Sequence, residues 1–221
     1  MKEIKYALFD VDGTLIDSMQ YWQTGAAEYL MKKGKMEKLP DDINEKLKTL
    51  SIVEGVMLLA QSFPDLMQGF TFQSFHDIIG AHYERDASLR PGVPALLSHL
   101  ASRGVRMAIL TASFEDLVQK LFRRLGIDGY FEFIFTGKDF PKGKADPAIF
   151  RAALDRLSAT PAETILFEDS LYSAETAHAL GIRIAAIHDK CEPEWEKLRA
   201  LSEIAFDDGV FTAEKIAEIV N

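Results

Sequence analysis

Two carboxylates, one residue apart, follow an apolar run near the start of the chain. The run Ile4–Phe9 is typical of a buried strand, and Asp10, Asp12, Gly13 and Thr14 lie just after it. A hydrophobic core gains nothing from such a pair, because buried charges are costly unless something pairs with them. The spacing therefore predicts that Asp10 and Asp12 carry out chemistry.

More polar side chains lie near the ends of other predicted strands. In an open α/β sheet, ligands bind beyond the carboxyl ends of the strands, near the point where the strand order reverses. Four separate patches of sequence are expected to converge at that edge. Besides Asp10 and Asp12, they comprise Thr111, Ala112 and Ser113 after the second strand, Lys144 in the loop before a helix, and Glu168 and Asp169 after the fourth strand.

The carboxylates Asp10, Asp12, Glu168 and Asp169 would repel one another at such an edge. Two carboxylates about 4 Å apart repel by roughly 4 kcal/mol at an effective dielectric constant near 20, whereas a whole fold is stable by only about 5–15 kcal/mol. The site therefore needs a cation or shifted protonation states. An all-oxygen ligand set, without histidine or thiolate, favours a hard ion such as Mg²⁺.

The remaining polar residues suit an anion. Thr111 offers a hydroxyl, the helix expected to begin at Ser113 offers backbone N–H groups, and Lys144 offers an ammonium group. Two of them have simpler interpretations: Ser113 could only cap its helix, and Lys144 shares its loop with Lys138 and Lys142. A cation and a tetrahedral anion beside a carboxylate indicate phosphoryl transfer.

Alternating strands and helices must position these residues. One helical pattern ends at Gly104, another runs from Ser113 to Gly126, and a third has Asp146 as its cap and Pro147 at its first position. This order predicts an α/β fold with a doubly wound parallel sheet, similar to a Rossmann fold. The predicted strands are Ile4–Phe9, Val105–Leu110, Phe133–Thr136, Thr164–Phe167, Ile182–Ile187 and Ile204–Phe206.

The segment 17–87 shows only helical periodicity. Its apolar stripes predict four amphipathic helices, and core packing is the simplest interpretation of their aromatic side chains. We therefore expect a catalytic core of residues 1–16 and 88–221, with 17–87 inserted after the first strand as a helical cap. Asp17 and Ser18 are interpreted as a hinge and a helix cap.

Composition limits the class of protein. The chain has 221 residues and a formal net charge of -9, and no compact stripe of Lys and Arg indicates a nucleic-acid partner. Its single cysteine fits a reducing compartment, its start lacks the apolar core of a signal peptide, and no apolar run reaches the about 18 residues of a membrane helix. We expect a cytoplasmic monomer that acts on a small molecule, with no nucleic acid and no membrane as partner.

Taken together, these motifs resemble those of the haloacid dehalogenase superfamily, in its phosphatase and phosphomutase branch. The sequence DVDGT at residues 10–14 is similar to the first motif of that superfamily, and LTAS at residues 110–113 is similar to the second. Lys144 corresponds to the third motif, and FEDS at residues 167–170 to the fourth. The resemblance covers essentially the whole chain in the right order, with the helical insert in the place of the cap.

The resemblance implies a Mg²⁺-dependent phosphatase that acts on a small phosphorylated metabolite. Asp10 would attack phosphorus and form an aspartyl-phosphate, while Asp12 would protonate the leaving oxygen and then take a proton from water. The implied phosphate-binding residues are Thr111, Ala112, Ser113 and Lys144; the implied metal ligands are Asp10, the backbone carbonyl of Asp12, Asp169 and Glu168, the last as a ligand or as an outer support.

Two positions depart from the superfamily pattern. Ala145 stands where proline usually follows the lysine, and Ser173 stands where glycine is common after the fourth motif. We expect both departures to concern the shape of the backbone more than the chemistry.

Three alternatives share part of this pattern. A β-phosphoglucomutase has the same core motifs, but that branch carries a histidine after its first motif and an arginine in its cap, where this chain has Trp22 and Ile52. These side chains can neither relay a proton nor hold a second phosphate. A dehalogenase needs no acid for a leaving alkoxide, yet Asp12 is present. A signalling receiver module, phosphorylated as a switch, is roughly half as long, lacks a helical insert and carries its phosphorylated aspartate on a later strand.

The sequence does not fix the substrate. Cap side chains that face the site should select it, and Trp22, Lys48, Ile52 and Tyr83 are the candidates.

Overall fold

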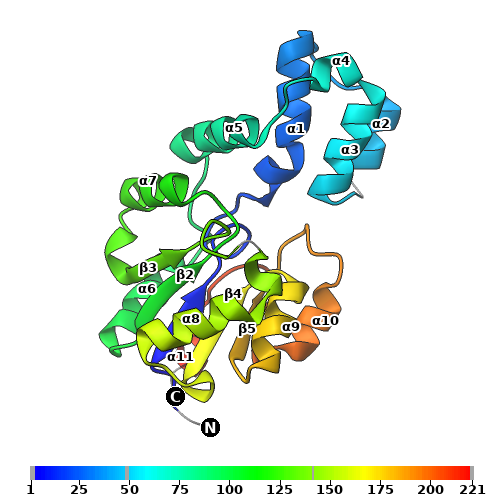
Figure 1. Cartoon of the computed structure of the whole chain (residues 1–221). Helices are drawn as coiled ribbons and strands as arrows, with labels where there is room; N and C mark the ends of the chain where they lie inside the picture. Colours follow the sequence, from blue (N-terminus) through cyan, green and yellow to red (C-terminus); the bar gives the residue numbers. More distant parts are fainter. Residues whose placement is uncertain (1–2, 48–49, 141, 220–221) are drawn as a thin grey trace. The chain divides into compact units, whose positions relative to one another are not determined.

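The computed structural model describes residues 3–47, 50–140 and 142–219. The chain divides into two compact units (Figure 1). The core unit comprises Met1–Asp17 and Ser88–Asn221, and the helical unit comprises Ser18–Ala87. Each unit has its own hydrophobic core.

A parallel sheet of six strands forms the centre of the core unit, within the described residues. The strand order is β3-β2-β1-β4-β5-β6, which confirms the predicted α/β fold with a doubly wound sheet. The strands are β1 (Tyr6–Phe9), β2 (Arg106–Leu110), β3 (Phe131–Phe135), β4 (Thr164–Glu168), β5 (Arg183–Ile187) and β6 (Ile204–Phe206).

The order of the strands reverses beside β1. The chain builds the sheet outwards from β1 through β2 to β3, and then returns to place β4 against the other side of β1. Phe9 pairs in register with Phe167, and their rings stack with centroids 4.4 Å apart. The residues that follow these two phenylalanines therefore emerge side by side at the switch point, where ligands bind in such folds.

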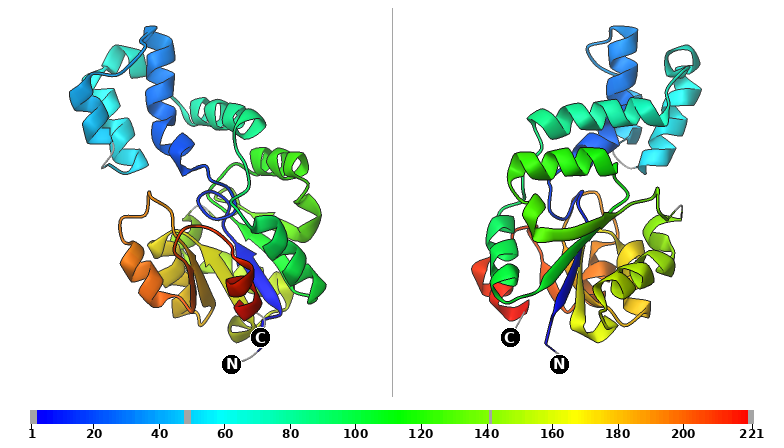
Figure 2. Two further views of the ribbon diagram at one scale, coloured as in Figure 1. Left: turned by 180° about the vertical axis from the view of Figure 1, so that it is seen from behind. Right: turned by 60° about the vertical axis from the view of Figure 1, so that its left-hand side comes forward.

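Helices cover both faces of the sheet (Figure 2). Helices α8, α9 and α10 pack on one face, where buried side chains such as Leu8, Phe150 and Leu166 form the core; α6 and α11 pack against each other on the opposite face. The helices of the core unit are α6 (Val93–Ser102), α7 (Glu115–Leu125), α8 (Pro147–Leu157), α9 (Leu171–Ala179), α10 (Trp195–Leu201) and α11 (Ala213–Ile219), with short 3-10 turns at Asp128–Tyr130, Gly143–Ala145 and Pro161–Glu163.

One predicted strand is displaced. The third strand begins at Phe131 and ends at Phe135, whereas a run from Phe133 to Thr136 was expected. The prediction required a continuous apolar run, but β3 is an edge strand whose exposed Glu132 pairs with Arg106 at 2.5 Å. An edge strand tolerates such a charged residue, because one of its sides faces solvent.

The helical unit consists of helices packed around a small apolar core. Ala26, Leu30, Ile43 and Leu59 are among its buried residues. Four helices were expected, and the structure adds a single turn, α4, between the third and the fourth. The segments are α1 (Met19–Gly34), α2 (Asp41–Leu47), α3 (Ile52–Ser62), α4 (Pro64–Met67) and α5 (Phe72–Arg85).

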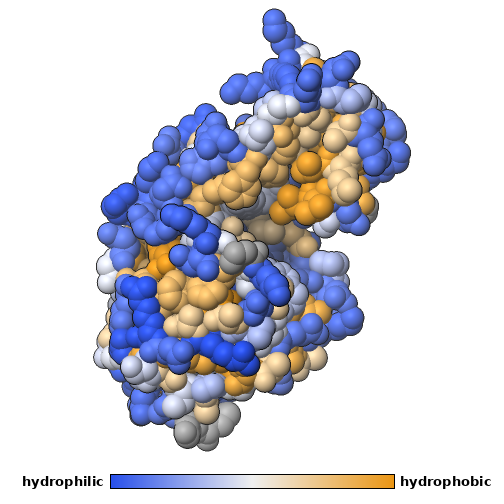
Figure 3. All heavy atoms as spheres, viewed as in Figure 1, coloured by the Kyte–Doolittle hydropathy of each residue, from blue (hydrophilic) through white to orange (hydrophobic). Residues whose placement is uncertain are grey.

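The surface of the helical unit carries exposed apolar side chains among polar ones (Figure 3). Val53 and Met57 lie one turn apart on α3 with exposed fractions of 69% and 57%.

Within the ranges described above, no helix combines the length and the apolar character needed to cross a membrane.

Candidate active site

Asp10 follows β1 at the carboxyl edge of the sheet. Its backbone N–H donates to the carbonyl oxygen of Phe167 on β4 at 3.0 Å, so β1 and β4 still pair at this position. The side chain of Asp10 is only 7% exposed. The sheet therefore fixes this carboxylate on a rigid strand end.

A tight turn follows and returns the chain beneath the site. Gly13 has a φ of 88°, in the left-handed region that favours glycine, and its N–H donates to the carbonyl oxygen of Ile16 at 2.9 Å. Asp12 forms an isolated bridge with Ile16 and is half-buried. The turn thus brings Asp12 to the same edge while leaving it partly accessible.

Three buried carboxylates meet one ammonium group at this edge. Asp10, Glu168 and Asp169 each offer an oxygen atom, and these oxygens lie within 4.8 Å of one another. The Nζ of Lys144 lies 2.6 Å from Oδ1 of Asp10 and 2.7 Å from Oε2 of Glu168. Three of the four predicted patches thus contribute four residues to a single cluster: Asp10, Lys144, Glu168 and Asp169.

Burial distinguishes Lys144 from the other lysines of its loop. Lys144 is 4% exposed, whereas Lys138 and Lys142 are exposed. A short 3-10 turn, Gly143–Ala145, holds Lys144 just before α8. The simpler interpretation of Lys144 as a solvated loop lysine is therefore wrong.

The cluster shifts the protonation of its members. Burial raises the pKa of Asp10 to about 7, because desolvation and repulsion from Glu168 and Asp12 outweigh the attraction of Lys144. Burial also raises the pKa of Asp169 well above its usual range, with further repulsion from Asp10 and Glu168. Burial alone would lower the pKa of Lys144, but its carboxylate partners raise it well above the ordinary value. The ammonium group is therefore charged, and it does not balance three carboxylates.

This donor set fits a hard divalent cation. The three carboxylates are buried and supply only oxygen, which Mg²⁺ prefers. A cation would remove the repulsion that raises the pKa of Asp10 and Asp169. The group of three carboxylates does not include the side chain of Asp12.

The end of β2 supplies a second polar patch. Thr111 is 2% exposed, and its N–H donates to the carbonyl oxygen of Phe135 at 3.0 Å. Its Oγ1 accepts from the N–H of Ser113 at 3.0 Å. Ser113 is buried as well, whereas Ala112 between them is exposed.

Ser113 does not cap the helix that follows. Helix α7 begins at Glu115, and its N-cap residue is Phe114, without a side-chain cap. The helix therefore begins later than the expected Ser113, which lies in a turn where its N–H donates to Oγ1 of Thr111. The other predicted ends are confirmed: α7 ends at Gly126, and Asp146 caps α8 with Pro147 at its first position.

Two buried hydroxyl groups of the site received no role from the sequence. Oγ1 of Thr14 donates to Oδ1 of Asp169 at 3.1 Å, and Oγ of Ser173 donates to Oε2 of Glu168 at 2.6 Å. Both residues have an exposed fraction of 0%. The available signals were the place of Thr14 in the DVDGT motif and the departure at Ser173. The departure at Ser173 therefore adds a hydroxyl group that hydrogen-bonds to Glu168.

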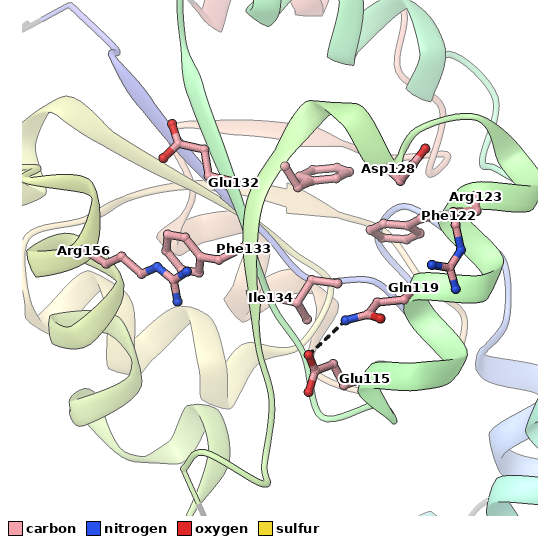
Figure 4. Close-up of a pocket in the computed structure, with 10 residues that line it drawn as sticks. Glu115, Gln119, Phe122, Arg123, Asp128, Glu132, Phe133, Ile134 and Arg156 are labelled. Carbon is pink, nitrogen blue, oxygen red and sulfur yellow. Dashed lines mark hydrogen bonds between the residues drawn. The ribbon is translucent and has the colours of Figure 1, made fainter.

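A pocket of about 400 Å³ lies elsewhere in the core unit, between α7 and β3 (Figure 4). Arg156 covers the ring of Phe133 at 4.3 Å, and Gln119 donates to Glu115 at 3.0 Å. None of the predicted site residues lines it. We therefore assign the chemistry to the carboxyl edge of the sheet.

The candidate cap residues differ in their burial. Trp22 and Ile52 are half-buried, and Tyr83 is buried with an exposed fraction of 2%. Ile52 is the first residue of α3, and Ser51 and Glu54 form a capping box at the start of that helix. Lys48 lies outside the described residues.

Comparison with known proteins places these motifs in context. A model of the haloacid dehalogenase-like hydrolase family matches residues 4–181. This stretch runs from the first strand past α9 and includes every predicted site residue. The match therefore covers both the sheet edge and the helical unit.

Two curated relatives and one solved structure illustrate the likeness. A phosphoglycolate phosphatase of Nitrosospira multiformis is 30% identical over 195 residues, which cover 83% of this chain and 83% of that protein. A phosphorylated carbohydrates phosphatase of Thermotoga maritima is 25% identical over 177 residues, covering 79% and 81%. The crystal structure of CbbY from Rhodobacter sphaeroides in complex with phosphate has a TM-score of 0.73 and 22% identity, and covers 97% of this chain and 99% of that one. The last likeness concerns the fold.

Proposed function

Because the chain belongs to the haloacid dehalogenase-like hydrolase family, we propose that it is a Mg²⁺-dependent phosphatase acting on a small phosphate monoester. The reaction passes through an aspartyl-phosphate on Asp10. One observation carries this proposal: Asp10 is a buried carboxylate at the switch point, with Lys144 at 2.6 Å and two further carboxylates within 4.8 Å.

The first step transfers the phosphoryl group to the protein. An oxygen of Asp10 attacks phosphorus, the P–O bond to the substrate alcohol breaks, and the alcohol oxygen leaves with the bonding electrons. Asp12 gives its proton to that oxygen. Lys144, Thr111 and Ser113 stabilise charge on the transferring group.

The second step releases phosphate. Asp12, now ionised, takes a proton from a water molecule, whose oxygen attacks the aspartyl-phosphate. The acyl-phosphate bond breaks, which restores the carboxylate of Asp10. Asp10, Asp169 and the backbone carbonyl of Asp12 would hold Mg²⁺, with Glu168 as a ligand or a support. The ion supplies positive charge to the phosphate oxygens.

We assign the helical unit, residues 18–87, the role of a cap that selects the substrate. Two connections join it to the core unit, at Asp17–Ser18 and at Ala87–Ser88. Closure of the cap would exclude water while the aspartyl-phosphate forms. Hydrogen exchange at the two connections, with and without Mg²⁺ and a phosphate mimic, tests this role: unchanged exchange contradicts it.

Hydrolysis is favoured over a mutase reaction by the side chains of the helical unit. At the positions where a mutase would need a histidine and an arginine, the chain has Trp22 and Ile52. Trp22 packs against Phe75, with ring centroids 6.0 Å apart, so it serves the core of the unit. Assaying phosphate release and isomerisation side by side on β-glucose 1-phosphate distinguishes the two reactions.

The experiment that tests the proposal is a substrate screen. Phosphoglycolate and phosphorylated sugars come first, because the named relatives act on such compounds, followed by nucleoside monophosphates. We expect Mg²⁺-dependent release of inorganic phosphate by the wild type and none by Asp10→Asn or Asp10→Ala. Full Mg²⁺-dependent turnover by both variants would show that Asp10 is not the nucleophile.

A further inference from the structure

We propose that Ser173 is a positioning residue of the active site, which orients Glu168 and through it Lys144. The inference rests on the proposed function, since it gives Lys144 and the bound cation their roles. Glycine is common at this position in the superfamily that the sequence resembles, and glycine has no group that could donate here. Ser173 is thus a property of this chain.

The local fold brings Ser173 beneath the carboxylate. Glu168 is the last residue of β4, and Ser173 lies in the first turn of α9, five residues later. The N–H groups of Asp169 and Ser170, in the connecting turn, both donate to Oε1 of Glu168, at 3.2 and 3.1 Å. The side chain of Glu168 therefore folds back over its own turn, which places its other oxygen above α9.

Two side chains share that other oxygen. Oε2 of Glu168 accepts from Oγ of Ser173 at 2.6 Å and from Nζ of Lys144 at 2.7 Å. A carboxylate offers about four acceptor positions, so these four donors suit Glu168 to the role of an outer support of the metal site. Glu168 and Ser173 each have an exposed fraction of 0%. The hydroxyl of Ser173 is therefore one of the four donors to this buried carboxylate.

The hydroxyl of Ser173 has two consequences for the site. It prevents rotation of the Glu168 carboxylate, because rotation would break a short buried hydrogen bond. The hydrogen bond also weakens the attraction between Oε2 and Lys144. The ammonium group can then interact more strongly with Asp10 and the transferring phosphate. Without the hydroxyl, Glu168 would hold Lys144 more strongly and in a less defined position.

Ser173→Ala tests this role with little risk to the fold. The change removes only the hydroxyl, and alanine is the residue best suited to a helix. Titration of metal-depleted protein with MgCl₂ alone, by calorimetry, measures the affinity without any substrate. We expect the dissociation constant for Mg²⁺ to rise about tenfold, since loss of a partner that orients a metal-site carboxylate costs about 10- to 100-fold in affinity or activity. Ser173→Gly should behave in the same way.

Two controls separate positioning from a structural role. Thr176→Ala removes a hydroxyl from the same helix, one that donates to the carbonyl oxygen of Tyr172 at 2.9 Å; the Mg²⁺ affinity should not change. In a Glu168→Gln background, Ser173→Ala should have no further effect on Mg²⁺ affinity, because Ser173 acts through Glu168.

The kinetic readout follows once a substrate is known. Ser173→Ala should lower kcat about three- to tenfold with little change in KM, because Lys144 acts mainly in the transition state. Wild-type Mg²⁺ affinity in Ser173→Ala, whatever its melting temperature, would overturn the proposal, as would an undiminished effect in the Glu168→Gln background. If instead no phosphate ester is hydrolysed by the wild type, the proposed function fails, while the Mg²⁺ titration still decides the role of Ser173.

Discussion

The Nζ of Lys144 lies 2.6 Å from Oδ1 of Asp10, although 134 positions separate the two residues along the chain. The contact joins a loop before α8 to the end of β1, across the switch point of the sheet. Both side chains are buried, so the pair is not an exposed surface ion pair, which would contribute little to stability. It supplies a fixed positive charge beside the proposed nucleophile.

Replacing Lys144 by methionine should lower kcat/KM by about 100-fold or more, since it removes a charged donor from a buried site where charge develops. Steady-state kinetics at saturating Mg²⁺ provide the measurement. Lys142→Met is the matched control, because Lys142 lies in the same loop and is exposed. Equal effects of the two substitutions would refute the role given to Lys144.

Thr14→Val should weaken Mg²⁺ binding about tenfold, because the hydroxyl of Thr14 orients Asp169 through a buried bond of 3.1 Å. Valine preserves the shape of the side chain, so the fold should survive. Thr24→Val serves as the control, since the Thr24 hydroxyl donates to the carbonyl oxygen of Gln20 in α1 at 2.8 Å. Unaltered affinity in Thr14→Val would mean that Asp169 needs no such support.

Arg90 and Asp189 form a buried ion pair in the core unit, with side-chain exposed fractions of 9% and 5%. Arg90→Met should lower the free energy of unfolding by about 3–5 kcal/mol, because it leaves Asp189 charged, buried and without this partner. The exposed pair Arg199–Asp207 offers the comparison: Arg199→Met should cost much less than Arg90→Met, because solvent screens an exposed ion pair. Chemical denaturation of both variants gives the two values, and similar losses would contradict the argument.

His82 should make the stability of the helical unit depend on pH. Its two ring nitrogens lie 2.7 Å from Glu28 and 2.9 Å from Asp86, and its ring stacks on Tyr21. Burial alone would lower the pKa of His82, but hydrogen bonds with the two carboxylates raise it above 6.5. The stabilisation is therefore complete below the unfolded pKa and is lost as the pH rises through the folded one.

The corresponding measurement compares the wild type with His82→Gln. The difference in free energy of unfolding between them should be larger at about pH 5.5 than at about pH 8.5, in line with that sign. A difference that grows with pH would show that the imidazole is neutral when it bridges the two carboxylates.

The sequence was sufficient to predict the sheet and the residues at its edge. Strand ends such as Asp10 and Asp169 could be recognised because a polar residue after a continuous apolar run has few structural explanations. The bounds of the edge strand β3 were predicted wrongly, because Glu132 interrupts the apolar run although it lies within the strand. A strand that is buried on both faces can be recognised by its continuous apolar run. A strand with one exposed side is harder to recognise, because charged residues interrupt the run.

What the sequence could not provide is the set of hydrogen bonds between distant segments. Thr14 and Asp169 are 155 positions apart, and no periodicity connects them. Position in the motif order selected Lys144 over Lys138 and Lys142, but only tertiary packing shows which of these lysines is buried. Ser113 was expected at a helix cap, since a serine before an acidic residue favours one, but the helix begins at Glu115 with Phe114 at the N-cap position.

The central claim is that Asp10 becomes transiently esterified to phosphorus. Rapid mixing of the protein with a hydrolysed substrate and Mg²⁺, followed by denaturation and borohydride reduction, converts an aspartyl-phosphate to homoserine. Mass spectrometry of the peptide that contains residue 10 should then find homoserine at Asp10, only when substrate is present. An unmodified Asp10 during rapid turnover, or homoserine at another aspartate, would contradict the account.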